Sequence, residues 1–268
     1  MRYQIDVTAA ETSVDDWDGI RERRVFRFGT RNNAVSCWID HGNLRGFEYQ
    51  MARLFASKND LMLQVVVADD LQQMVQMLRE GKVDAIGAML TDTPNRVFAD
   101  LAPTRFYHRT DEVVVGRGGE AVITDHAQLA GRTIHVRPQS SYAYHLAALQ
   151  ERGASLNVAF VDADMETETI LNTVAEGGFD LTVADRVIAE LELQGRADLA
   201  ILGTVVPDTA QVWYVRANNP VLRKHLDGFW DTTYRGIEYN MARKANFTAR
   251  QEQRATGLGR AGSHQSVR

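Results

Sequence analysis

The chain has 268 residues, of which 44% are hydrophobic and 24% charged, as in a globular protein with one large or two modest cores. Its formal net charge of -5 offers no electrostatic footprint for nucleic acid, and no apolar run approaches the ~20 residues that cross a bilayer. The single cysteine, Cys37, excludes an internal disulfide and a zinc site built on several cysteines.

Strand and helix patterns alternate along most of the chain. Residues 1–20 are polar and acidic and predict a loose leader. Strands are then expected at 24–29, 61–67, 83–88 and 112–116, with helices at 46–56 and 71–78. A second set has expected strands at 133–136, 156–160, 179–183, 199–203 and 211–215, with helices at 140–149, 166–175 and 186–193. A long amphipathic helix is expected over 220–242, and residues 247–268 predict a disordered tail or linker.

Alternation of this kind predicts an α/β fold in which helices cover parallel sheets. Two sets of roughly 90 residues each predict two lobes. Lobe one is expected to comprise residues 21–116 plus 212–246, and lobe two residues 117–211. The chain would cross twice between the lobes, which favours closure about a hinge.

A polar segment after the third expected strand favours binding of a small anion. Thr93 is a good helix N-cap, and Pro94 suits the first helical position. Backbone N–H groups at such a helix start attract anions, and the guanidinium of Arg96 matches a carboxylate with two parallel hydrogen bonds. The segment therefore predicts a carboxylate site at the end of a strand.

Seven short motifs occur in an order that is typical of one family. They are residues 25–30, 46–49, 81–85, the T-x-T-P-x-R motif from Thr91 to Arg96, residues 129–132, Ser140–Ser141, and residues 179–185. In this order the chain resembles the family 3 extracellular solute-binding proteins over about residues 21–245. That resemblance implies the two-lobed, type II periplasmic-binding-protein-like fold, the Venus flytrap of amino-acid receptors.

Three segments resemble a narrower group, the binding domain of the membrane-bound lytic murein transglycosylase F family. They are residues 16–30, 136–144 and 234–244. In that family a muramidase-like domain with a catalytic glutamate follows the binding domain. The chain ends at Arg268, so the resemblance predicts the sensor half alone.

The resemblance also implies roles for individual residues. Arg96 would hold the ligand's α-carboxylate, although a surface arginine paired with a nearby acid is the alternative. Thr91 would add a hydroxyl and an N–H, or serve only the turn. Asp185 would pair with the α-ammonium, cap a helix, or do both. Ser140 and Ser141 would cap a helix and direct N–H groups to the same carboxylate.

Aromatic residues are candidates for the walls of the cleft, although each also suits the core. They are Trp38, Phe106, Tyr107, Tyr142 and Tyr144. The resemblance implies that Glu48 lies near the cleft side, although a solvated helix residue is the favoured expectation. The chain departs from the amino-acid receptors at Met89, where a small residue is usual, and at Gln139, where glycine is usual, and these changes weigh against tight amino-acid binding.

Three classes of function remain open from the sequence. The first is a binding or sensory module for an amino acid or cell-wall peptide, partnered by a transglycosylase domain. The second is a receptor for an ABC permease, and the third is an enzyme like the cyclohexadienyl dehydratases. No metal or cofactor motif is evident, and nucleic acid is not an expected partner. The resemblance implies a periplasmic or envelope location, although no signal peptide is visible in Met1–Ala10.

Overall fold

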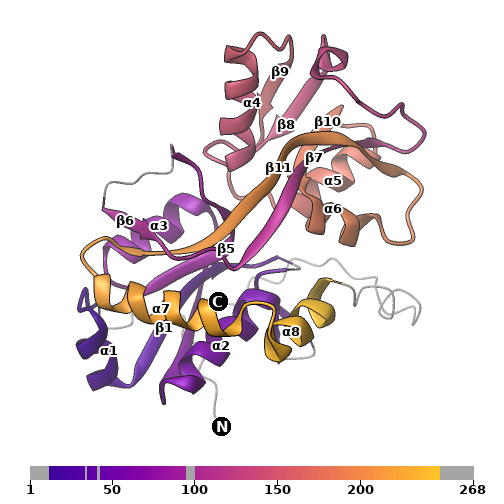
Figure 1. Ribbon diagram of the computed structural model, residues 1–268. Helices are drawn as coiled ribbons and strands as arrows, with labels where there is room; N and C mark the ends of the chain where they lie inside the picture. The colour runs from indigo at the N-terminus through magenta and orange to yellow at the C-terminus, as the bar shows by residue number, and fades with distance from the viewer. Residues whose placement is uncertain (1–11, 34, 41–42, 95–99, 248–268) are drawn as a thin grey trace, which may run out of the picture.

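The computed structural model describes residues 12–33, 35–40, 43–94 and 100–247, and it has two lobes (Figure 1). Two long strands, β7 (His108–Arg117) and β11 (Leu199–Arg216), run from one lobe to the other and pair antiparallel along most of their length. The predicted two-lobed α/β architecture is therefore confirmed.

Each lobe contains three parallel strands, and β11 and β7 join the two sets into one sheet with the strand order β4-β1-β5-β11-β7-β10-β8-β9. Lobe one contributes β1 (Val25–Arg31), β4 (Met62–Ala68) and β5 (Ala85–Thr91). Lobe two contributes β8 (Thr133–Val136), β9 (Asn157–Phe160) and β10 (Leu181–Asp185). The short β6 (Leu101–Pro103) pairs with β11, while β2 (Trp38–Asp40) and β3 (Asn43–Arg45) form a separate hairpin.

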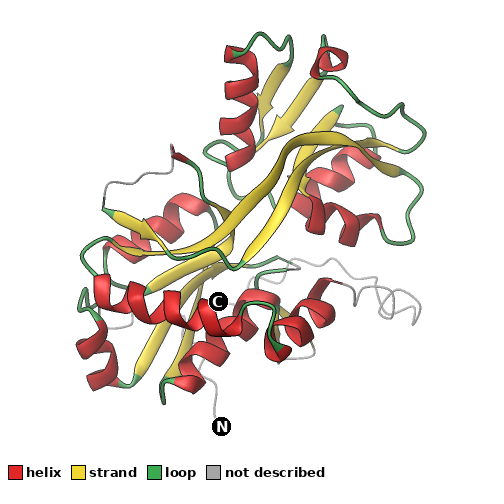
Figure 2. Ribbon diagram, viewed as in Figure 1, coloured by secondary structure: helices red, strands yellow, loops and turns green. Residues whose placement is uncertain are grey.

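Helices cover the sheet of each lobe (Figure 2). In lobe one they are α1 (Trp17–Arg23), α2 (Phe47–Lys58), α3 (Leu71–Arg79), α7 (Pro220–Thr233) and α8 (Ile237–Phe247). In lobe two they are α4 (Ser141–Glu151), α5 (Thr167–Ala175) and α6 (Arg186–Leu193), preceded by a 3-10 turn at His126–Leu129. None of the helices in the described part of the chain has the length and apolar character needed to span a membrane.

Separate hydrophobic clusters stabilise the two lobes. The largest cluster lies in lobe one, where the rings of Trp213 and Trp230 meet edge to face with centroids 4.9 Å apart. Lobe two has its own cluster, which includes the fully buried Ile134, Leu146 and Leu181. The lobe-one cluster also includes Ile188 and Leu191 of α6, so the two lobes share an apolar contact in addition to the β7–β11 ribbon.

Several predicted elements have other bounds in the structure, among them the strand expected at 112–116, which extends over His108–Arg117. The strands expected at 199–203 and 211–215 are one strand, β11, whose middle follows β7 through irregular pairing between Thr204 and Thr209. The half-exposed ribbon there lacks the apolar alternation by which a strand is recognised. The helix expected over 220–242 ends at Thr233, because Arg235 adopts a left-handed conformation with φ 58° and a second helix follows.

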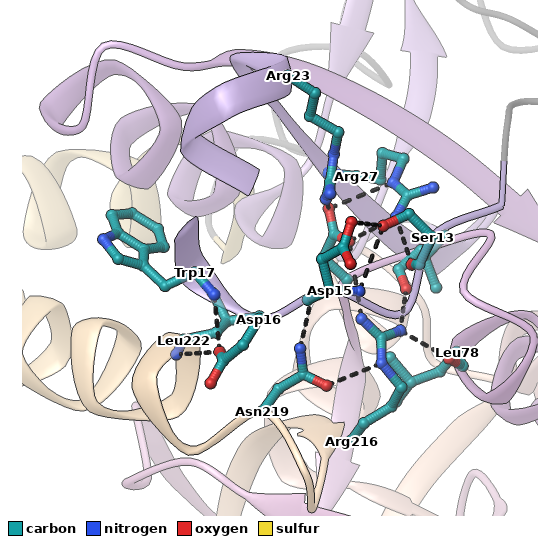
Figure 3. A network of polar contacts seen from close by, with 12 residues as sticks. Ser13, Asp15, Asp16, Trp17, Arg23, Arg27, Leu78, Arg216, Asn219 and Leu222 are labelled. Carbon is teal, nitrogen blue, oxygen red and sulfur yellow. Dashed lines mark hydrogen bonds and ion pairs between the residues drawn. The ribbon is translucent and has the colours of Figure 1, made fainter. Parts of the chain in front are cut away.

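The prediction of a loose leader over residues 1–20 is wrong for residues 12–20, and residues 1–11 lie outside the described part of the chain. Residues 248–268 of the predicted tail also lie outside it. Trp17 and Ile20 are buried in lobe one. The Asp16 carboxylate accepts hydrogen bonds from the backbone N–H groups of Trp17 and Leu222, both at 2.8 Å (Figure 3). This segment therefore fastens the start of α1 to the start of α7, which no local pattern predicts.

Candidate ligand-binding site

A cavity of about 140 Å³ lies between the lobes, at the carboxyl ends of their parallel strands. Arg31 at the end of β1 and Met89 in β5 line it from lobe one. Residues 137–142 after β8 and Asp185 at the end of β10 line it from lobe two. Ligands of open α/β sheets bind at such strand ends, so this cavity is the candidate site.

The start of α4 forms one wall of the cavity. The Ser140 hydroxyl caps this helix, since it accepts the N–H of Ala143 at 3.1 Å and donates to the carbonyl of Arg137 at 2.8 Å. Ser141 is the first helical residue and is buried. Gln139 has a left-handed φ of 61°, a conformation that glycine adopts without strain, which accounts for the usual glycine at this position. The backbone path is thus kept although the residue type has changed.

Asp185 and Tyr142 form a buried pair beside this helix. The Tyr142 hydroxyl accepts the backbone N–H of Asp185 at 3.1 Å. Burial raises the pKa of Tyr142 well above its ordinary value, and the nearby acids Asp185 and Glu112 act in the same direction. In the described chain the Asp185 side chain makes no capping hydrogen bond to α6. The capping alternative for Asp185 therefore lacks its expected contact.

Five charged residues that line the cavity were not predicted from the sequence: Arg31, Asp70, Arg137, Glu166 and Glu168. Arg31 of lobe one forms an ion pair with Glu166 of lobe two, Nη2 to Oε1 at 2.8 Å. Arg137 lies near them and donates from Nη1 to the carbonyl of Met165 at 2.9 Å and to the hydroxyl of Thr167 at 3.1 Å. Arg31 and Arg137 both occupy the carboxyl end of a parallel strand, and that position is the signal that could have revealed them.

A buried carboxylate shapes the lobe-one wall. Glu48 is fully buried, so its expected role as a solvated helix residue is wrong. Its oxygens accept hydrogen bonds from the Tyr107 hydroxyl, from Trp213 Nε1 at 2.5 Å and from the backbone N–H of Met89 at 2.9 Å. Burial raises the pKa of Glu48, while these three hydrogen bonds oppose the shift. The network holds Met89 at a left-handed φ of 52°, so Glu48 fixes part of the cavity wall.

The structure brings together only part of the predicted site. Ser140, Ser141, Tyr142 and Asp185 all line the cavity. Thr91 is buried in the lobe-one sheet, where its hydroxyl accepts a hydrogen bond from Gln211 Nε2 at 3.1 Å. The remaining two residues are Trp38, which lies on the β2–β3 hairpin opposite Arg45, and Arg96, which lies outside the described residues.

The other candidate aromatics pack within the lobes. Tyr107 is fully buried and stacks on Trp230, and Phe106 packs against Tyr234. Tyr144 lies on α4 beside His145. Across the described residues, no group of three or more His, Cys, Asp or Glu side chains is arranged to hold a metal ion.

The sequence model of one protein family, the bacterial extracellular solute-binding proteins, family 3, matches residues 26–249. The chain belongs to this family. Curated relatives named membrane-bound lytic murein transglycosylase F include one from Desulfosudis oleivorans, 32% identical over 203 residues, and one from Photobacterium profundum, 29% identical over 207. The matches cover 75% and 76% of this chain but only 44% and 40% of those relatives, so the chain spans less than half of their length.

Solved structures of amino-acid binding proteins share the fold of this family member. An arginine-bound ABC transporter substrate-binding protein from Streptococcus pneumoniae has a TM-score of 0.75 at 13% identity, with 87% of this chain and 98% of that chain covered. A mutant of ArgBP from T. maritima has a TM-score of 0.73 at 20% identity, covering 86% and 98%. At such identities the likeness establishes the type II periplasmic-binding-protein fold and nothing finer.

Proposed function

We propose that the chain is a solute-binding module that holds an amino acid, or the end of a cell-wall peptide, in the cavity between its lobes. The observation that carries the proposal is the juxtaposition of the α4 start with the buried Asp185 carboxylate in one cavity. The helix start attracts a carboxylate, and the carboxylate of Asp185 attracts an ammonium group. A zwitterionic ligand supplies both groups.

The size of the cavity favours a small guest. An engineered protein cavity of about 150 Å³ binds benzene. The cavity of about 140 Å³ between the lobes therefore has room for a guest of similar size. An amino acid or one residue of a peptide therefore suits this arrangement of the lobes. A longer peptide requires the lobes to open along the β7–β11 ribbon, which is the connection that Figure 1 shows.

The relatives favour a sensory role in the cell envelope over a transport role. The curated matches are lytic murein transglycosylases, and the family is extracellular, which supports a periplasmic or envelope location and a transglycosylase domain as partner. The alternative is a receptor for an ABC permease, which the fold of the arginine-bound S. pneumoniae protein allows. A third candidate is a dehydratase, since the fold is shared with an ancestral amino acid-binding protein described as a precursor of cyclohexadienyl dehydratase, with a TM-score of 0.72 at 16% identity.

A thermal-shift screen against amino acids and muropeptides tests the proposal. A ligand at 100 times its Kd should stabilise the protein by about 2.7 kcal/mol. We expect the shift to disappear in Asp185→Asn and in Arg96→Ala, while Asp198→Asn, which alters an exposed acid of lobe two, should keep it. A screen without any shift would contradict the proposal, and turnover of prephenate or arogenate would favour the dehydratase instead.

A further inference from the structure

Arg31 is a buried cation whose hydrogen-bonding capacity is only partly used. Its side chain is 7% exposed, at the end of β1 in the cavity wall. The Nη2 atom makes the ion pair with Glu166 and donates to the carbonyls of Asp69 at 3.2 Å and Asp164 at 3.5 Å. The Nε atom is buried and has no hydrogen-bond partner among the described residues. An arginine held this way lacks the two parallel bonds that a carboxylate makes with a guanidinium.

Its partner, Glu166, is less firmly held than Arg31 itself. Glu166 belongs to lobe two, and its side chain is 25% exposed. It occupies the N-cap position of α5 but makes no capping hydrogen bond within the described chain. The pair therefore joins a fixed guanidinium in one lobe to a partly solvated carboxylate in the other, and it breaks whenever the lobes separate.

A second guanidinium lies near this ion pair. Arg137 extends from lobe two toward the same cavity. Burial lowers the pKa of Arg31, and the positive charge of Arg137 contributes to that lowering, while Glu166 and Asp70 oppose it. Burial raises the pKa of Glu166, with Arg31 and Arg137 opposing. Glu166 thus lies near guanidiniums of both lobes, and Asp70 and Glu168 are further acids close to the pair.

We propose that Arg31 is an anion-binding residue of the cavity, that Glu166 is its resting partner, and that a ligand's second carboxylate takes the place of Glu166. The ligand class is an amino acid or short peptide with an acidic side chain, and this assignment rests on the proposed function. A ligand carboxylate that meets both Nε and Nη2 supplies the missing parallel bond, while Glu166 turns to solvent. One carboxylate replaces another on a guanidinium that is already buried, so desolvation of the guanidinium is not repeated.

Pairs of ligands that differ only in one charge test the assignment by calorimetry. The probes are L-glutamate against L-glutamine, L-aspartate against L-asparagine, and L-alanyl-D-glutamate against L-alanyl-D-glutamine. We expect the wild-type protein to prefer the acidic member of at least one pair by tenfold or more. Arg31→Gln should remove that preference, whereas Arg79→Gln, which alters a surface ion pair with Asp100, should keep it.

Whether Glu166→Gln strengthens or weakens ligand binding distinguishes the proposal from the alternative, in which the Arg31–Glu166 pair only holds the lobes together. If Glu166 competes with the ligand, Glu166→Gln should tighten binding of the acidic member severalfold and leave the neutral member nearly unchanged. Weaker binding of both members would show that the pair is only a latch between the lobes, and would overturn the assignment even if Arg31→Gln failed to fold. Equal binding of acidic and neutral members would also overturn it, with the proposed function intact. Absence of binding by any probe or muropeptide would overturn both.

Discussion

At the scale of single residues, buried ionisable groups define the cavity more than aromatic side chains do. Glu48 is fully buried and receives three hydrogen bonds, one of them from the backbone of the cavity residue Met89. A helix residue with a charged side chain is normally assigned to solvent, because burial of a carboxylate is costly without donors. Two of its three donors lie far along the chain, Tyr107 just before β7 and Trp213 in β11, so the sequence around Glu48 does not reveal them.

His108 makes stability depend on pH in a predictable direction. Burial, aided by the nearby charge of Arg243, lowers the pKa of His108 from 6.5 to about 4. The folded protein therefore binds fewer protons than the unfolded chain between these values, and stability falls as pH decreases from about 6.5 to 4. The difference in pKa corresponds to about 3 kcal/mol in the limit of low pH.

Denaturant unfolding at several pH values measures this dependence in wild type and His108→Gln. We expect the free energy of unfolding of the variant to fall less steeply over this interval, because glutamine does not titrate. Other acids titrate in the same range, so the comparison is the difference between the two curves. Parallel curves would contradict the prediction.

At the scale of elements, hydrogen bonds between the starts of α1 and α7 hold the segment before α1 on lobe one. Asp16 caps α1 and also accepts hydrogen bonds from Val221 at 3.0 Å and Leu222 at 2.8 Å, in the first turn of α7. Asn219, just before α7, donates to the carbonyl of Asp15 at 2.7 Å (Figure 3). One acidic residue thus satisfies N–H groups of two helices that are distant in sequence.

Loss of the Asp16 carboxylate should destabilise lobe one. We expect Asp16→Ala to lower the free energy of unfolding by about 1–2 kcal/mol, since N-cap removal typically costs that much and two helices share this cap. Asp18→Ala is the matched control, because Asp18 is an exposed acid in the first turn of α1. Equal effects of the two substitutions in chemical denaturation would show that Asp16 acts only through its charge.

At the scale of the whole molecule, the β7–β11 ribbon and the apolar contact of α6 with the lobe-one cluster join the two lobes, and the site lies where the lobes meet. Cys37 is a natural probe of lobe one, because it is the only cysteine and is 1% exposed. Burial raises the pKa of its thiol to about 11. The thiolate, which is the reactive form, is therefore scarce in the folded protein at pH 8.

Reaction with Ellman's reagent should report opening of the molecule. We expect the native protein at pH 8 to react at least roughly a hundredfold more slowly than the protein in guanidinium chloride, from the difference in thiolate fraction alone. Cys37→Ser should give no signal. A native rate close to the denatured rate would mean that the segment around Cys37 is open in solution.

The local structure of this protein follows from residues that are close together along the chain. Periodicity placed most strands and helices, the Ser140 cap is where the pattern predicts it, and four of the seven predicted site residues, Ser140, Ser141, Tyr142 and Asp185, line one cavity. These features depend on interactions between residues a few positions apart, such as hydrophobic periodicity and helix capping, so the local sequence predicts them.

Contacts between residues far apart along the chain depend on the fold as a whole. The pairing of Arg31 with Glu166, the burial of Glu48 and the packing of residues 12–20 each join segments that the sheet order brings together. The continuity of β11 is of the same kind, since its half-exposed middle is held by pairing with β7. A hydrogen bond or ion pair of this type is set by the three-dimensional path of the chain, and no spacing along the sequence encodes it.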